Sequence, residues 1–197
     1  MRFLGILLVL SFLTNSLTSC RKTRGCTDPE ALNYNKDASK DDHSCYYYWI
    51  GQSYGGGKVF YIDQTKKHGL IACPFDLPST PWGCISPAIS VNTSTDVGTG
   101  LSNTEAIVAA YTTISAASIC YNLDTLGFND WYLPSTQELV GLDKTLGVMA
   151  EANLGSGYYW SSSQSDTNAA WSVMMDNGSP VIFNKCSAYS VRPIRSF

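Results

Sequence analysis

The chain has 197 residues, a formal net charge of −3, and only 15% charged residues against 12% aromatic ones. The mild negative charge argues against a nucleic-acid-binding surface, so we expect no nucleic-acid partner, and the apolar content argues against disorder. The length predicts one domain of ordinary size with a small appendage, and the wealth of Tyr, Trp, Ser and Asn is typical of exported β-rich domains and of binding surfaces.

The N-terminus reads as an export signal. An apolar run, Phe3 to Leu13, follows Arg2 and is too short to cross a bilayer, and Leu17-Thr18-Ser19-Cys20 closes it. This sequence resembles the lipobox of bacterial lipoprotein precursors. The resemblance implies that residues 1–19 are removed and that Cys20 becomes the first mature residue, carrying acyl chains such as palmitate that hold the protein to a membrane. An ordinary secretory signal with a chance cysteine is the alternative.

Residues 20–25 form a short lipidated tether with a basic stretch, Arg-Lys-Thr-Arg-Gly, after Cys20. It is able to lie against anionic headgroups, although a solvated linker is the favoured interpretation. Asp does not follow Cys20, which resembles lipoproteins sent to the outer membrane. We therefore expect attachment there, at its periplasmic face or at the cell surface.

Residues 26–45 resemble a small exported module with the pattern GCTDP-A-NYN-A-DDGSC. His43 stands where the module has Gly, at a turn that would need a positive φ. The oxygen-bearing side chains suit either calcium or Asx turns, and we favour turns because the spacing is not that of an EF-hand. They are Asp28, Asn33, Asn35, Asp37, Asp41 and Asp42.

Six cysteines remain beside Cys20, an even number in an exported chain, which predicts three disulfides. They are Cys26, Cys45, Cys73, Cys84, Cys120 and Cys186. We expect Cys26 with Cys45, Cys73 with Cys84, and Cys120 with Cys186. Cys73 with Cys186 and Cys84 with Cys120 would serve equally well. A metal site is not expected, because no CxxC occurs and only two histidines are present.

From residue 46 to 197 the pattern predicts one α+β unit. Strands are expected at 47–51, 58–63 and 68–73, with a turn at Gly55–Gly57 and a long excursion over 74–100 pinned by Cys84. A first helix, capped by Asn103 or Thr104 with Glu105 in its opening turn, should run to Cys120.

A second helix should begin at the capping box Ser135–Glu138 and bury Leu139, Leu142 and Leu146. Short strands with a turn at Asn177-Gly178 should fill the C-terminal third. Helices followed by strands within one unit indicate α+β.

Several motifs occur in order over residues 49–197: WGC at 82–84, DWYLPS at 130–135 followed by EL, YWSSS at 159–163 and VRPIR at 191–195. Together they resemble the bacterial Lcl C-terminal domain family. The resemblance implies a C-type-lectin-like fold, with two helices before a looped sheet and the chain ends on neighbouring strands. Pro193 stands where many relatives have cysteine, which implies Cys186 as the replacement partner of Cys120.

We expect no enzymatic chemistry and no cofactor. No nucleophile elbow or histidine-paired nucleophile is present, and Asp124, Asp130, Glu138 and His68 are explained as turn, cap and solvated residues. The calcium-ligand motifs of true C-type lectins are also missing. An enzyme of the formylglycine-generating-enzyme-like fold is the minor alternative, and it would need a reactive free thiol.

The predicted ligand face carries short polar and aromatic side chains of the kind found in paratopes. Its residues are Tyr158, Gln164, Asp166, Asn168, Asn177 and Tyr189. Trp160 and Trp171 are expected in the core. The prediction is a membrane-anchored envelope lipoprotein that recognises or adheres to a protein or glycan ligand, and the alternative is a structural envelope protein without an exchangeable ligand.

Overall fold

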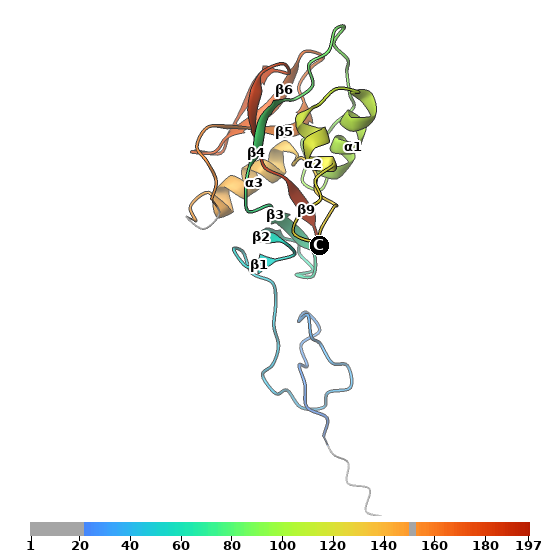
Figure 1. Cartoon of the computed structure of the whole chain (residues 1–197). Helices are drawn as coiled ribbons and strands as arrows, with labels where there is room; N and C mark the ends of the chain where they lie inside the picture. The colour runs from blue at the N-terminus through green and yellow to red at the C-terminus, as the bar shows by residue number, and fades with distance from the viewer. Residues whose placement is uncertain (1–21, 150–152) are drawn as a thin grey trace, which may run out of the picture.

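The computed structural model describes residues 22–149 and 153–197 (Figure 1). The predicted signal segment 1–19 and the acylated Cys20 lie outside the described residues. Within the described ranges, every helix is too short or too polar to cross a membrane. Mixed helix and sheet is confirmed, with three helices and two sheets in the part of the chain described.

The smaller sheet joins the start and the end of the predicted 46–197 unit. Its order is β1 (Ser53–Tyr54), β2 (Gly57–Ile62), β3 (Gly69–Ala72) and β9 (Ile194–Ser196), and all its pairs are antiparallel. In β3, Ile71 lies opposite Arg195, so the C-terminal strand completes a sheet begun more than a hundred residues earlier. Closing this contact fixes both ends of the unit together.

The larger sheet has the order β4 (Leu77–Pro81), β8 (Ala188–Val191), β5 (Tyr158–Gln164), β6 (Ala169–Met174) and β7 (Ser179–Asn184). All pairs are antiparallel except β5 with β8. The chain passes from this sheet to the smaller one at Arg192-Pro193. Arg192 is fully buried there, and its Nε donates to Asp76 over 2.6 Å while Nη1 donates to the Cys73 carbonyl.

The predicted first helix is two helices, α1 (Gly100–Ala110) and α2 (Ala116–Tyr121). Thr112, Thr113 and Ile114 are β-branched and disfavour helix, and Ser115 starts α2 with a capping box to Ser118. The predicted caps were also wrong.

Thr99 is the N-cap of α1, so Asn103 and Thr104 lie inside the helix, both buried, and the first turn holds no acidic residue. The side-chain amide of Asn103 donates to the Ser94 carbonyl over 2.7 Å, which holds the preceding loop against α1.

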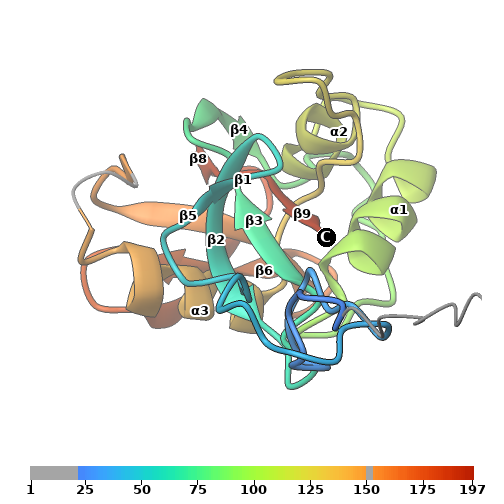
Figure 2. The same ribbon diagram turned by 90° about the horizontal axis from the view of Figure 1, so that it is seen from below.

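The predicted second helix is confirmed as α3 (Thr136–Leu146), with the capping box of Ser135 and Glu138 in place. Leu139, Leu142 and Leu146 are buried with Tyr159 of the larger sheet and Phe60 of the smaller one. Figure 2 shows α3 on one side of the molecule and α1 and α2 on the other. The second group packs around Trp82, Ile107 and Trp160, all fully buried.

The first strand differs from the expectation. The glycine turn is confirmed, because Gly55 and Gly56 have φ of +53° and +83°, but the strand before it is Ser53–Tyr54 and not 47–51. Tyr47 instead reaches back to bond Asp28, and Tyr48 packs edge-on against Phe197 with ring centroids 4.5 Å apart. Side-chain contacts, together with the Gly51 backbone amide that donates to the Val59 carbonyl over 2.7 Å, fix this segment.

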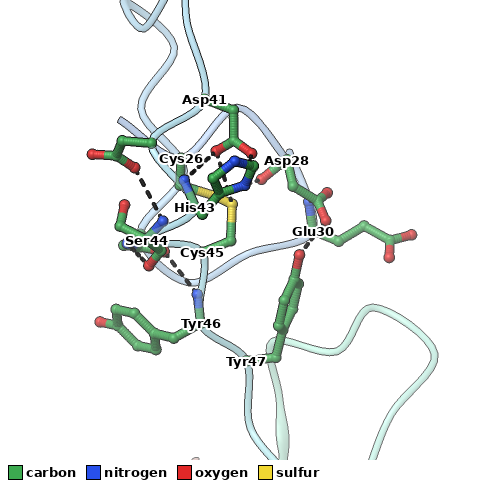
Figure 3. Close-up of a disulfide and its surroundings, with 11 residues drawn as sticks. Cys26, Asp28, Glu30, Asp41, His43, Ser44, Cys45, Tyr46 and Tyr47 are labelled. Carbon is green, nitrogen blue, oxygen red and sulfur yellow. Dashed lines mark hydrogen bonds and ion pairs between the residues drawn. A yellow bond between two sulfur atoms is a disulfide. The ribbon is translucent and has the colours of Figure 1, made fainter. Parts of the chain in front are cut away.

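The Cys26–Cys45 disulfide is confirmed (Figure 3). Between these cysteines, Asp28, Asn35, Asp41 and Asp42 each accept a hydrogen bond from the amide two residues further on, as Asx turns do. His43 adopts a positive φ of 62° at the position where the resembling module has glycine. Local side-chain bonds and one disulfide therefore replace a core in this module.

Both predicted pairings of the other four cysteines were wrong. The structure joins Cys84 to Cys186, and Cys73 and Cys120 are free and buried. The reason is the path of the excursion. The Gly83 amide donates to the Lys185 carbonyl over 3.2 Å, which places the next residues, Cys84 and Cys186, side by side. Cys73 instead lies opposite Pro193, to whose carbonyl its amide donates over 2.9 Å.

Candidate ligand-binding surface

The predicted ligand residues do not form one face. Tyr158 and Tyr189 are half-buried and belong to an aromatic cluster with Phe183, with centroid distances of 4.8 Å from Tyr158 and 4.6 Å from Tyr189. Tyr189 also packs on the buried Trp160 at 5.1 Å. These ring contacts cover part of both tyrosines and stabilise the sheet.

The side chain of Gln164 is engaged in hydrogen bonds within the domain. Its Oε1 accepts from the Val91 amide over 2.8 Å and from Lys185 Nζ over 2.6 Å, and its Nε2 donates to Ser90 over 2.9 Å. Two of these three bonds, to Val91 and Ser90, reach the excursion 74–100. Gln164 therefore holds the loop in place.

Asp166 and Asn168 are exposed in the turn between β5 and β6, whereas Asn177 is exposed in the turn between β6 and β7. Successive turns of an antiparallel meander fall at opposite ends of the sheet. Asp166 and Asn168 therefore lie at one end of the sheet and Asn177 at the other, so the structure does not bring these predicted residues together.

Lys185 is a residue that the sequence analysis missed. It is 2% exposed, and its ammonium donates to the carbonyls of Ile89 (3.1 Å) and Thr167 (2.9 Å) as well as to Gln164. It also lies 4.7 Å from the Trp82 ring centroid. Burial lowers the pKa of Lys185 to about 8. Lys185 thus joins the excursion to the β5–β6 turn, and the neighbouring Cys84–Cys186 disulfide joins the excursion to the turn between β7 and β8.

Trp171 is half-buried and not a core residue, in contrast to Trp160, whose core position is confirmed. Trp171 lies opposite the exposed Ile182 in the β6–β7 pair. With Thr95, Gln137 and Pro180 it lines a hollow of about 390 Å³, to which Thr136 also contributes. We call this hollow the Trp171 groove.

The elements around the Trp171 groove are firmly placed. The Gln137 amide donates to the Thr95 carbonyl over 3.0 Å, which fixes the end of the excursion to the first turn of α3. The Trp171 carbonyl accepts from Ser161 over 2.7 Å, and the Thr136 hydroxyl lies 3.0 Å from the Ser161 hydroxyl. The Trp171 indole and the exposed side chain of Gln137 thus both line the Trp171 groove.

The acidic residues considered as catalytic groups are engaged in structure. Asp130 forms a bidentate pair with Arg195, both distances 2.7 Å, and the hydrogen bonds from Arg195 lower the pKa of Asp130. Glu138 accepts from the Gly98 and Ser135 amides over 2.8 and 2.7 Å, while burial raises the pKa of Glu138. Asp124 and His68 are exposed. Among the described residues, no three His, Cys, Asp or Glu side chains group as a metal site would require.

Residues 92–195 match the Lcl C-terminal domain, which is more than half of the chain. The chain belongs to the Lcl C-terminal domain family. No curated protein matches it. The Lcl C-terminal domain match spans α1 to α3 and reaches into β9, so it contains every residue that lines the Trp171 groove, and Lys185 as well.

Proposed function

We propose that this protein is a membrane-anchored envelope lipoprotein whose Lcl C-terminal domain recognises an external protein or glycan and performs no chemistry. The proposed site of attachment is the outer membrane, through acyl chains on Cys20, with the domain on the periplasmic side or at the cell surface. A C-type-lectin-like architecture is part of the proposal. It is supported by β9, which brings the end of the domain beside β3, and by the looped sheet that follows the helices.

The observation that carries the proposal is the Trp171 groove. An indole presents a large flat apolar face and loses little conformational entropy on binding, which is why Trp is enriched where proteins bind ligands. The adjacent Gln137 side chain is exposed and offers both a donor and an acceptor. This combination suits a sugar ring or an extended peptide.

A second hollow, of about 440 Å³, lies at the glycine turn and is lined by Tyr54, Gly56 and Lys58 among others. Leu126 is its only lining residue within 92–195. A hollow lined by polar residues between Asn92 and Asn103 also lies within 92–195, but none of its described lining residues is aromatic. We therefore assign recognition to the Trp171 groove, which lies wholly within the family domain and presents an indole.

The binding experiment uses the mature chain, residues 20–197 with Cys20→Ser, on panels of glycans and extracellular proteins, with calcium and with chelator. Trp171→Ala should weaken binding of any ligand found by about tenfold or more, the loss typical of a central aromatic contact. Trp49→Ala is the matched control, because Trp49 is 60% exposed and lies outside the groove.

Equal losses in both variants would refute the groove as the binding site. Binding lost with chelator would refute metal-free recognition, and silence across the panels would favour a structural envelope role. Acylation is tested separately in the producing cells: a palmitate label should appear on the wild-type chain and be absent from Cys20→Ser.

A further inference from the structure

A cluster of cations forms where the described chain begins. Arg24 and Lys40 are partners in a parallel β-bridge, and the Thr23 carbonyl accepts from the Ser39 and Lys40 amides over 2.9 and 3.2 Å. Lys22, Arg24 and Lys40 are all exposed and line one hollow together with Thr23. Folding thus adds Lys40, sixteen residues away from Arg24, to the basic tether seen in the sequence.

The basic face, defined as Lys22, Arg24 and Lys40, has no acidic partner: none of the three forms an ion pair within the described ranges. Two of the module's acids are engaged elsewhere. Asp28 bonds Tyr47 (Figure 3), and Glu30 pairs with Lys66 of the large domain. Among the described residues, the three cations of the basic face therefore remain unpaired where the chain enters, while Asp28 and Glu30 contact the large domain.

The whole chain is unevenly charged in the same sense. Residues 21–45 hold five basic and five acidic residues, a net charge of 0, whereas residues 46–197 hold seven basic and eleven acidic ones, a net charge of −4. Figure 1 shows the module at one end of the molecule and the large domain beyond it. An anionic surface would attract the basic face and repel the large domain.

We propose that the basic face binds the anionic phospholipid headgroups of the membrane that holds the protein. This rests on the proposed acylation of Cys20, because two residues of chain span at most about 7 Å, so Lys22 cannot leave the headgroup layer. Lys40 is held near the headgroups as well, because it is paired with Arg24 in the β-bridge. The module lies on the membrane and the acidic domain projects away from it.

The test measures co-sedimentation of the unlipidated mature chain, Cys20→Ser, with phosphatidylcholine vesicles that contain or lack phosphatidylglycerol. We expect binding only where phosphatidylglycerol is present, weakening as salt is raised. Arg24→Gln/Lys40→Gln should lower the partition coefficient by about thirtyfold at low salt, roughly fivefold for each cation. Lys67→Gln/Lys144→Gln removes two exposed cations of the large domain and should leave it unchanged.

Equal binding to both vesicle types, or equal losses in the two double variants, would overturn the proposal. Circular dichroism of both variants confirms that the fold is retained. The two proposals can fail separately. If the lipidated chain stays in the membrane fraction but the unlipidated chain does not bind phosphatidylglycerol vesicles, only the proposal for the basic face is refuted. If the chain carries no acyl group, only the proposed acylation of Cys20 is refuted.

Discussion

The Cys84–Cys186 disulfide should contribute most of the covalent stability of the large domain. It spans 102 residues, whereas Cys26–Cys45 spans 19. Restriction of the unfolded chain by a loop of that length stabilises the native state by about 4 to 5 kcal/mol, against about 3 kcal/mol for the shorter loop. The two bridges therefore differ mainly in the folding unit that each constrains, the module for Cys26–Cys45 and the large domain for Cys84–Cys186.

Cys84→Ser/Cys186→Ser isolates this effect, because both cysteines are exposed and the serines leave no cavity in the core. Urea unfolding followed by tryptophan fluorescence reports on the large domain, since all five tryptophans lie at or beyond Trp49. The free energy of unfolding should fall by about 4 to 5 kcal/mol.

Cys26→Ser/Cys45→Ser is the matched control. It removes a bridge that closes only the module, so the fluorescence transition of the large domain should stay where it is. A loss below about 1 kcal/mol in the first variant, or equal losses in both, would refute the chain-entropy reasoning.

Other predictions concern buried groups and a helix cap. Burial raises the pKa of both Cys73 and Cys120, so the native Cys20→Ser chain should resist alkylation and yield two thiols once denatured without reductant; fewer thiols would show a bridge between them. The pKa of Lys185 is about 8 against an ordinary 10.5, so the unfolded chain holds the proton more tightly between these values, and the free energy of unfolding should rise with pH across that window. Relative to Lys185→Met the rise should approach about 3 kcal/mol, and parallel pH profiles of the two proteins would contradict it. Ser135→Ala removes the cap of α3 and should cost about 1 kcal/mol in thermal unfolding, whereas Ser165→Ala, at an exposed turn, should cost far less.

The sequence predicts those elements whose signals are local. The Ser135–Glu138 capping box and the leucine spacing after it lie within one segment, and α3 forms where they indicate. The break between α1 and α2 also has a local signal, in the β-branched Thr112 to Ile114 and the cap at Ser115, but the apolar spacing through Cys120 masks it.

Features that depend on distant contacts could not be predicted in this way. The bond of Cys84 to Cys186 follows from the Gly83–Lys185 hydrogen bond, which joins residues about a hundred positions apart. Trp171 was assigned to the core from its motif, yet it lies beside the first turn of α3, where part of its ring stays uncovered. The charge of Lys185 gave no sign that carbonyls from two loops would surround it.

Ligand binding by the Trp171 groove is the central claim, and one measurement tests it most directly. The mature Cys20→Ser chain is titrated with the strongest ligand from the glycan and protein panels, beside Trp171→Ala and Trp49→Ala. The account predicts a Kd about tenfold or more weaker for Trp171→Ala and unchanged for Trp49→Ala. An unchanged Kd for Trp171→Ala, with the fold intact by circular dichroism, would contradict it.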